Sequence, residues 1–77
     1  MKYWTVHESG KYFTEYHLVV NDRMCNFKRI FEFRTENGVF YTFKDSTKGI
    51  RYSSLTKNQL HEILKRYRLP QLGQVKE

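Results

Sequence analysis

The sequence predicts an α+β fold, a five-stranded antiparallel meander covered by one C-terminal amphipathic helix. The first two-thirds of the 77 residues is rich in β-branched and aromatic residues, interrupted by short polar turns. The last third carries an apolar stripe at helical spacing. A chain of this length forms one domain. We expect this domain to cover residues 1–70 and a polar, flexible tail to follow at 71–77.

Strands are expected wherever runs of Tyr, Phe, Thr, Val and Ile lie between polar or glycine-containing segments. Two of these segments, residues 8–10 and 36–38, end in glycine and have the composition of tight hairpin turns. The order of strands and turns along the chain favours a meander, with each strand beside the next. The expected strands cover residues 2–7, 11–20, 27–35, 39–44 and 50–53.

The register of the second hairpin depends on the length of its loop. A three-residue loop, with Gly38 in the left-handed position of a G1 bulge, places Phe33 opposite Tyr41. A two-residue loop at residues 37–38 would divide the aromatic side chains between both faces. Because burial of one face fixes register, we predict the three-residue loop. The aromatic face would then contain Phe27, Phe31, Phe33, Val39, Tyr41 and Phe43, joined from the first hairpin by Trp4, Val6, Tyr12, Tyr16 and Leu18.

The helix follows from its capping residues. Thr56 and Gln59 match the capping box, in which each side chain accepts a hydrogen bond from the other residue's backbone amide. Pro70 predicts that the helix ends at residue 68 or 69. The apolar stripe, which is the expected lid of the aromatic face, contains Leu60, Ile63, Leu64 and Tyr67. The alternative architecture is a sheet curled into a small barrel, with the helix plugging one open end.

The charge favours a polyanionic partner. Fourteen Lys and Arg against eight Asp and Glu give a formal charge of +6 and a pI near 9.6, which suits nucleic acid or an acidic protein. Cys25 is the single cysteine, so an intramolecular disulfide is excluded and a reducing, cytoplasmic location is expected. The longest apolar run has three residues, so no signal peptide, membrane span or membrane partner is expected.

Two surfaces are candidates for binding DNA or RNA. One edge of the predicted helix carries Lys57, His61, Lys65 and Arg68, within an arc of about 80°. The outward face of the sheet is expected to place Arg34 opposite Phe40, an aromatic ring beside cations that suits base stacking and phosphate contact. Arg29 falls at an inward position, where its stem would cover the core edge and its guanidinium would reach solvent. The alternative is a bulge that shifts the register at this point. The sheet candidates are Lys28, Arg34, Phe40 and Lys44.

A non-enzymatic nucleic-acid-binding module is therefore the first hypothesis. No motif for a catalytic nucleophile, a phosphate-binding loop or a dinucleotide is present. The three His and one Cys lack metal-ligand spacing, so neither a metal nor a cofactor is expected. The alternative is a small, phage-encoded modulator that docks on an acidic host protein through a sheet edge or an exposed aromatic face. A monomer or a homodimer fits either hypothesis.

Overall fold

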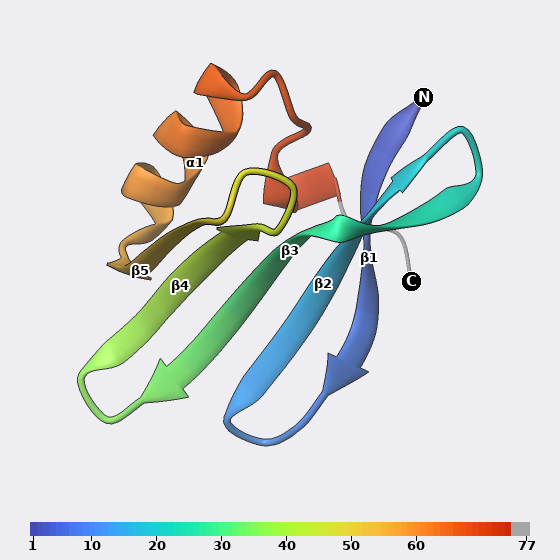
Figure 1. Cartoon of the computed structure of the whole chain (residues 1–77). Coiled ribbons are helices and arrows are strands. Elements are labelled where there is room, and N and C mark those ends of the chain that lie inside the picture. Colours follow the sequence, from blue (N-terminus) through green and yellow to red (C-terminus); the bar gives the residue numbers. More distant parts are fainter. Residues whose placement is uncertain (75–77) are drawn as a thin grey trace.

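A computed structural model describes residues 1–74 (of Gln74, the backbone alone) and has a five-stranded antiparallel sheet with one helix on one face (Figure 1). The strands lie in chain order across the sheet, so β1 and β5 occupy opposite edges. The predicted meander is confirmed, and the sheet is not closed into a barrel. Within residues 1–74, no helix is long and apolar enough to cross a membrane. The elements are β1 (Lys2–Ser9), β2 (Phe13–Val20), β3 (Arg23–Thr35), β4 (Gly38–Asp45), β5 (Ile50–Leu55), α1 (Lys57–Arg66) and the 3-10 helix η1 (Leu72–Gln74).

The helix begins as predicted. The Thr56 hydroxyl accepts a hydrogen bond from the Gln59 amide at 3.2 Å, and the Gln59 side chain accepts one from the Thr56 amide at 2.9 Å. The helix ends at Arg66, slightly earlier than predicted, because Arg68 adopts a left-handed conformation with φ of 56°. The amides of Arg68 and Leu69 then bond back to the carbonyls of Lys65 and Leu64, which completes a Schellman motif.

The predicted register of the second hairpin is wrong by one residue. The loop contains two residues, Glu36 and Asn37, so Thr35 pairs with Gly38, and Phe33 pairs with Phe40 rather than Tyr41. The Thr35 hydroxyl stabilises this turn, because it donates to the Gly38 carbonyl at 2.9 Å and accepts from the Asn37 amide at 3.1 Å. Gly38, with φ of 121°, is thus the first residue of β4.

A one-residue shift turns every side chain of β3 to the other face relative to β4. Ile30 therefore lies opposite Phe43, and both side chains are fully buried beneath α1. Phe31 and Phe33, predicted to be in the core, lie on the opposite face of the sheet. Phe27, Val39 and Tyr12, also predicted for the aromatic face beneath the helix, are exposed instead of buried. Val39 does lie on the same side of β4 as Tyr41 and Phe43.

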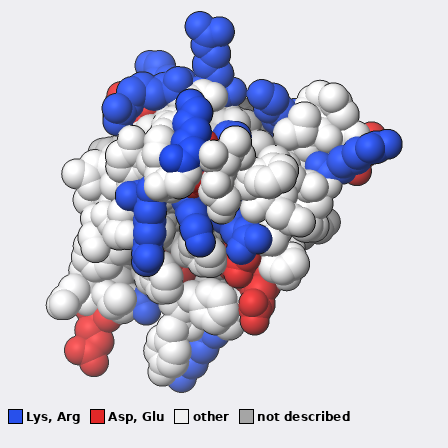
Figure 2. Space-filling model, in the orientation of Figure 1, with Lys and Arg blue, Asp and Glu red and all other residues white. Residues whose placement is uncertain are grey.

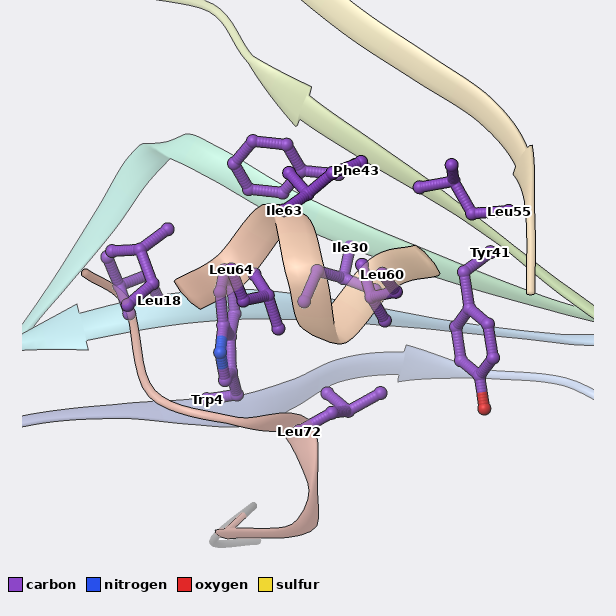
Figure 3. Close-up of a cluster of buried hydrophobic side chains, with 11 residues drawn as sticks. Trp4, Leu18, Ile30, Tyr41, Phe43, Leu55, Leu60, Ile63, Leu64 and Leu72 are labelled. Atoms are coloured by element: carbon purple, nitrogen blue, oxygen red, sulfur yellow. The ribbon is translucent and has the colours of Figure 1, made fainter. Parts of the chain in front are cut away.

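The core lies between α1 and the face of the sheet that we call the core face (Figure 3). Leu60, Ile63 and Leu64 point from α1 toward the sheet and are at most 4% exposed. Burial of each such side chain stabilises the fold by about 1.5–3 kcal/mol. The sheet contributes to this core Trp4, Leu18, Ile30, Tyr41, Phe43 and Leu55.

The chain after the helix also packs on the core face. The Trp4 indole donates to the Pro70 carbonyl at 2.8 Å, and Leu69 and Leu72 are each 7% exposed. These contacts hold η1 against β1 (Figure 1). The packed domain thus continues beyond the expected boundary at Pro70, at least to Leu72, because this leucine of the polar segment reaches the core. The rest of the expected tail, residues 75–77, lies outside the described residues.

Candidate nucleic-acid interface

The face of the sheet opposite α1, which we call the open face, has no helix over it (Figure 1). Side chains alternate between the two faces along each strand, so the residues that alternate with the core residues on β2 to β5 point to this face. They form a row of aromatic rings near the β1–β2 and β3–β4 turns and a row of cations further from these turns, at the middle of β3 and the end of β4. The open-face residues of these two rows and of the space between them are Phe13, Phe33, Phe40, Phe31, Thr42, Arg29, Lys44 and Arg51.

The aromatic row crosses three strands. Phe33 on β3 is the Cα partner of both Phe13 on β2 and Phe40 on β4. Phe31 lies two residues further along β3, with its ring centroid 6.4 Å from that of Phe33 and the two planes 17° apart. Phe33 is 42% exposed, and the other three are half-buried. The row therefore offers ring surface on which a planar ligand can stack.

The cation row also crosses three strands. Lys44 on β4 is the Cα partner of Arg29 on β3 and of Arg51 on β5. No ion pair joins any of the three to a carboxylate among residues 1–73. Figure 2 shows Lys and Arg side chains gathered over the middle of the sheet on the face toward the viewer. Three uncompensated cations on neighbouring strands favour an anionic ligand.

A shallow hollow of about 200 Å³ connects the two rows. Its walls combine the rings of Phe31 and Phe33, the hydroxyl of Thr42, and the charged ends of Lys44 and Arg51. Rings, a hydrogen-bonding hydroxyl and cations are the groups that bind a base together with its phosphate.

The carboxylates of Glu8 and Glu15 lie at the β1–β2 side of this face. Glu8 on β1 is the Cα partner of Glu15 on β2. Glu15 is in turn the Cα partner of Phe31 on β3. Its Oε2 lies 2.6 Å from Nε2 of His17, which is 3% exposed. This contact holds the Glu15 carboxylate on the β1–β2 side of the open face. The cation row lies on the other part of the open face, which is formed by β3, β4 and β5.

Arg34, predicted to bind nucleic acid, instead lies on the core-face side of β3 and pairs with Val39, not Phe40. Its guanidinium makes five hydrogen bonds, which equals its number of N–H donors. Nη1 donates to the Glu32 carboxylate at 2.7 Å and to the Thr14 hydroxyl at 2.9 Å. The remaining donors reach the carbonyl oxygens of Lys11, Gly10 and Phe13. Arg34 thus ties the first hairpin loop to β3 and has no donor left for a phosphate.

Glu32 links Arg34 to a buried tyrosine. The Tyr41 hydroxyl donates to Glu32 Oε2 at 3.0 Å, and Tyr41 is 6% exposed. Burial, together with the hydrogen bond to the Glu32 carboxylate, raises the pKa of Tyr41 to about 12. Tyr41 therefore stays neutral at physiological pH and serves the fold.

The other predicted cations are dispersed. Lys28 lies 4.0 Å from the buried carboxylate of Asp45, at the start of the β4–β5 loop. Lys57 and Lys65 are exposed on α1, but His61 between them has a buried Nε2 without a hydrogen-bond partner among the described residues. Arg68 has left the helix. Of the predicted site residues, the structure brings together on one surface Phe40 and Lys44.

Sequence reasoning missed Phe31, Phe33, Arg29 and Arg51. The incorrect register places the first three on the core face, and Arg51 lies on a short strand for which the sequence predicts no face. One signal was present in the sequence, because a core-facing Arg29 between two Phe residues conflicts with burial. Shifting β3 by one residue removes this conflict and places the buried Ile30 in the core.

Comparison with known proteins gives no match. No family model, no curated protein and no solved structure is significantly similar to this chain.

Proposed function

We propose that the protein is a non-enzymatic module that binds single-stranded nucleic acid on the open face. The observation that carries the proposal is the cation row beside the aromatic row, on strands that run directly next to one another. Rings and cations hold a ligand but do not transfer protons, so the proposed role is binding rather than catalysis.

The spacing of the two rows supports this proposal. Phe31 is two residues from Arg29 on β3, a separation of about 7 Å along the strand. A nucleotide stacked on Phe31 or Phe33 would place its phosphate toward Arg29, Lys44 and Arg51. Successive nucleotides would cross the strands, because both rows run in that direction.

A single strand fits this surface better than a duplex. Bases in a duplex are stacked on one another and are not available to protein rings, whereas unpaired bases can lie on Phe or Tyr side chains. Such stacking contributes about 1–3 kcal/mol per base and depends little on sequence. We therefore expect weak sequence preference and binding to both DNA and RNA single strands.

The proposal is tested by fluorescence anisotropy with labelled single-stranded oligonucleotides in a salt titration. Three phosphate contacts give a slope of log K against log salt of about −2 for a single strand. Lys44→Ala should reduce the magnitude of this slope by about 0.7. The matched control is Lys65→Ala, which removes an equal charge from the exposed surface of α1 and should leave the slope unchanged.

The aromatic row is tested separately. Phe33→Ala should weaken binding about 5- to 150-fold, which corresponds to the loss of one stacked base. Val39→Ala is the control, because Val39 is also exposed but lies on the side of β4 opposite Phe40. Absence of binding in low salt, or equal losses in Phe33→Ala and Val39→Ala, would reject the proposal.

A further inference from the structure

A cluster of potential metal ligands lies at the β1–β2 side of the open face. The spacing of histidines in the sequence gave no reason to expect a metal, because His7 and His17 are ten residues apart. Antiparallel pairing of β1 with β2 brings them together. The ligand atoms of His7, Glu15 and His17 all lie within 4.8 Å of one another.

A β-bulge positions His7 in this cluster. The register of β1 and β2 shifts between Val6 and Glu8, so His7 is the extra residue in the pairing. Bulges of this kind re-aim a side chain. The His7 ring stacks on the His17 ring, with centroids 3.9 Å apart and planes 11° apart. His7 is exposed, so its ring can turn out of this stack without disturbing the core.

His17 is held in an orientation that suits a metal ligand. Its Nδ1 faces the Met24 sulfur at 3.3 Å, and its Nε2 faces Glu15 Oε2 at 2.6 Å. A proton on Nδ1 directed at the sulfur leaves Nε2 as the atom for a metal. Ligating histidines commonly use the second ring nitrogen in this way, as a donor that fixes the ring. Arg29, the Cα partner of His17 on β3, donates its Nε to the Asn26 carbonyl at 3.2 Å.

We infer that His7, Glu15 and His17 bind a divalent transition-metal ion of the zinc type. Two imidazoles and one carboxylate match the donor preference of such ions, with water in the fourth position. Bond lengths of about 2.0–2.2 Å in a tetrahedral site separate the ligand atoms by about 3.3 Å. The ion would replace the proton between His17 and Glu15, and the separation of His17 Nε2 from Glu15 Oε2 would increase by about 0.7 Å, from 2.6 Å to that of a tetrahedral pair. The exposed His7 ring would tilt toward the ion.

The inference is tested by isothermal titration of the full chain with Zn²⁺ in a buffer that does not chelate it. We expect one ion per chain, with affinity reduced at least tenfold in His7→Ala. His7→Ala removes an exposed side chain, so its circular dichroism spectrum should match that of the wild type. Glu15→Gln is the second variant and should also lose at least tenfold in affinity, since a neutral amide is a weaker ligand than a carboxylate.

Two controls separate this site from other zinc-binding groups in the chain. His61→Ala removes the remaining histidine, which lies on α1, and Cys25→Ser removes the one thiol. Both variants should bind Zn²⁺ as the wild type does. No measurable binding at millimolar Zn²⁺ would overturn the inference. So would wild-type affinity in His7→Ala, or loss of binding in His61→Ala or Cys25→Ser.

Discussion

Replacement of Arg34 by lysine tests whether this cation stabilises the fold or binds nucleic acid. Lysine keeps the positive charge but has one nitrogen with three donors, whereas the guanidinium reaches five acceptors from three nitrogens. The acceptors lie on both sides of the side chain, with Glu32 on β3 and three carbonyl oxygens in the first hairpin. A single ammonium group cannot reach both, so at least two of the five bonds are lost.

The expected loss of stability is about 2 kcal/mol. A hydrogen bond from a charged group contributes about 1.5–3 kcal/mol when buried, but the Arg34 side chain is 34% exposed, and solvent screens part of this. We take about 1 kcal/mol for each of two lost bonds. With a urea dependence near 1 kcal/mol per M for a small domain, the unfolding midpoint should fall by about 2 M.

The assay is urea denaturation followed by circular dichroism, combined with oligonucleotide binding in a salt titration. Arg66→Lys is the matched control, because Arg66 is exposed in the last turn of α1 and its replacement should change stability by less than about 0.5 kcal/mol. The salt slope of folded Arg34→Lys should equal that of the wild type. An unchanged midpoint would contradict the role of Arg34 in holding the hairpin loop, and a reduced slope would place Arg34 in contact with phosphate.

Three further predictions concern the fold. Leu72→Ala should lower the free energy of unfolding by about 2–3 kcal/mol in a urea titration, because Leu72 is buried against the core; a change below about 0.5 kcal/mol would place η1 away from it. Arg68→Gly should raise thermal stability by about 1 kcal/mol, since glycine adopts the left-handed conformation at the helix end without a steric penalty; destabilisation would contradict the Schellman end. The raised pKa of Tyr41 implies stability that is fully present below pH 10 and is lost as the pH rises toward about 12, where the folded state ionises. Urea midpoints of the wild type and Tyr41→Phe across this range test it, and an equal pH dependence of the two would refute it.

The helix could be predicted from the sequence because its signals are local. The capping box, the apolar stripe and the proline all lie within about 15 residues of chain. The last residue of the helix is harder to predict from the sequence. Arg68 rather than glycine occupies the left-handed position, so the usual sequence mark of a Schellman motif is missing.

The hairpin register could not be predicted in the same way. Two turn lengths at residues 36–38 are compatible with local geometry, and the decision depends on which residues α1 covers. Counting aromatic side chains favoured the wrong face, since the core takes Ile30 from β3 and leaves Phe31 and Phe33 outside. The candidate site changed with the register. Lys44 and Phe40 kept their predicted outward position on β4, whereas Arg34 and Lys28 on β3 exchanged faces with Arg29.

The most direct test of the account is a map of backbone amide chemical shifts in the ¹⁵N-labelled protein as a single-stranded oligonucleotide is added. We predict that the largest changes lie on β3, β4 and β5, at Phe31, Phe33, Lys44 and Arg51. Small changes are expected along α1, at Lys57 and Lys65. Changes concentrated on α1, with the open face unaffected, would contradict it.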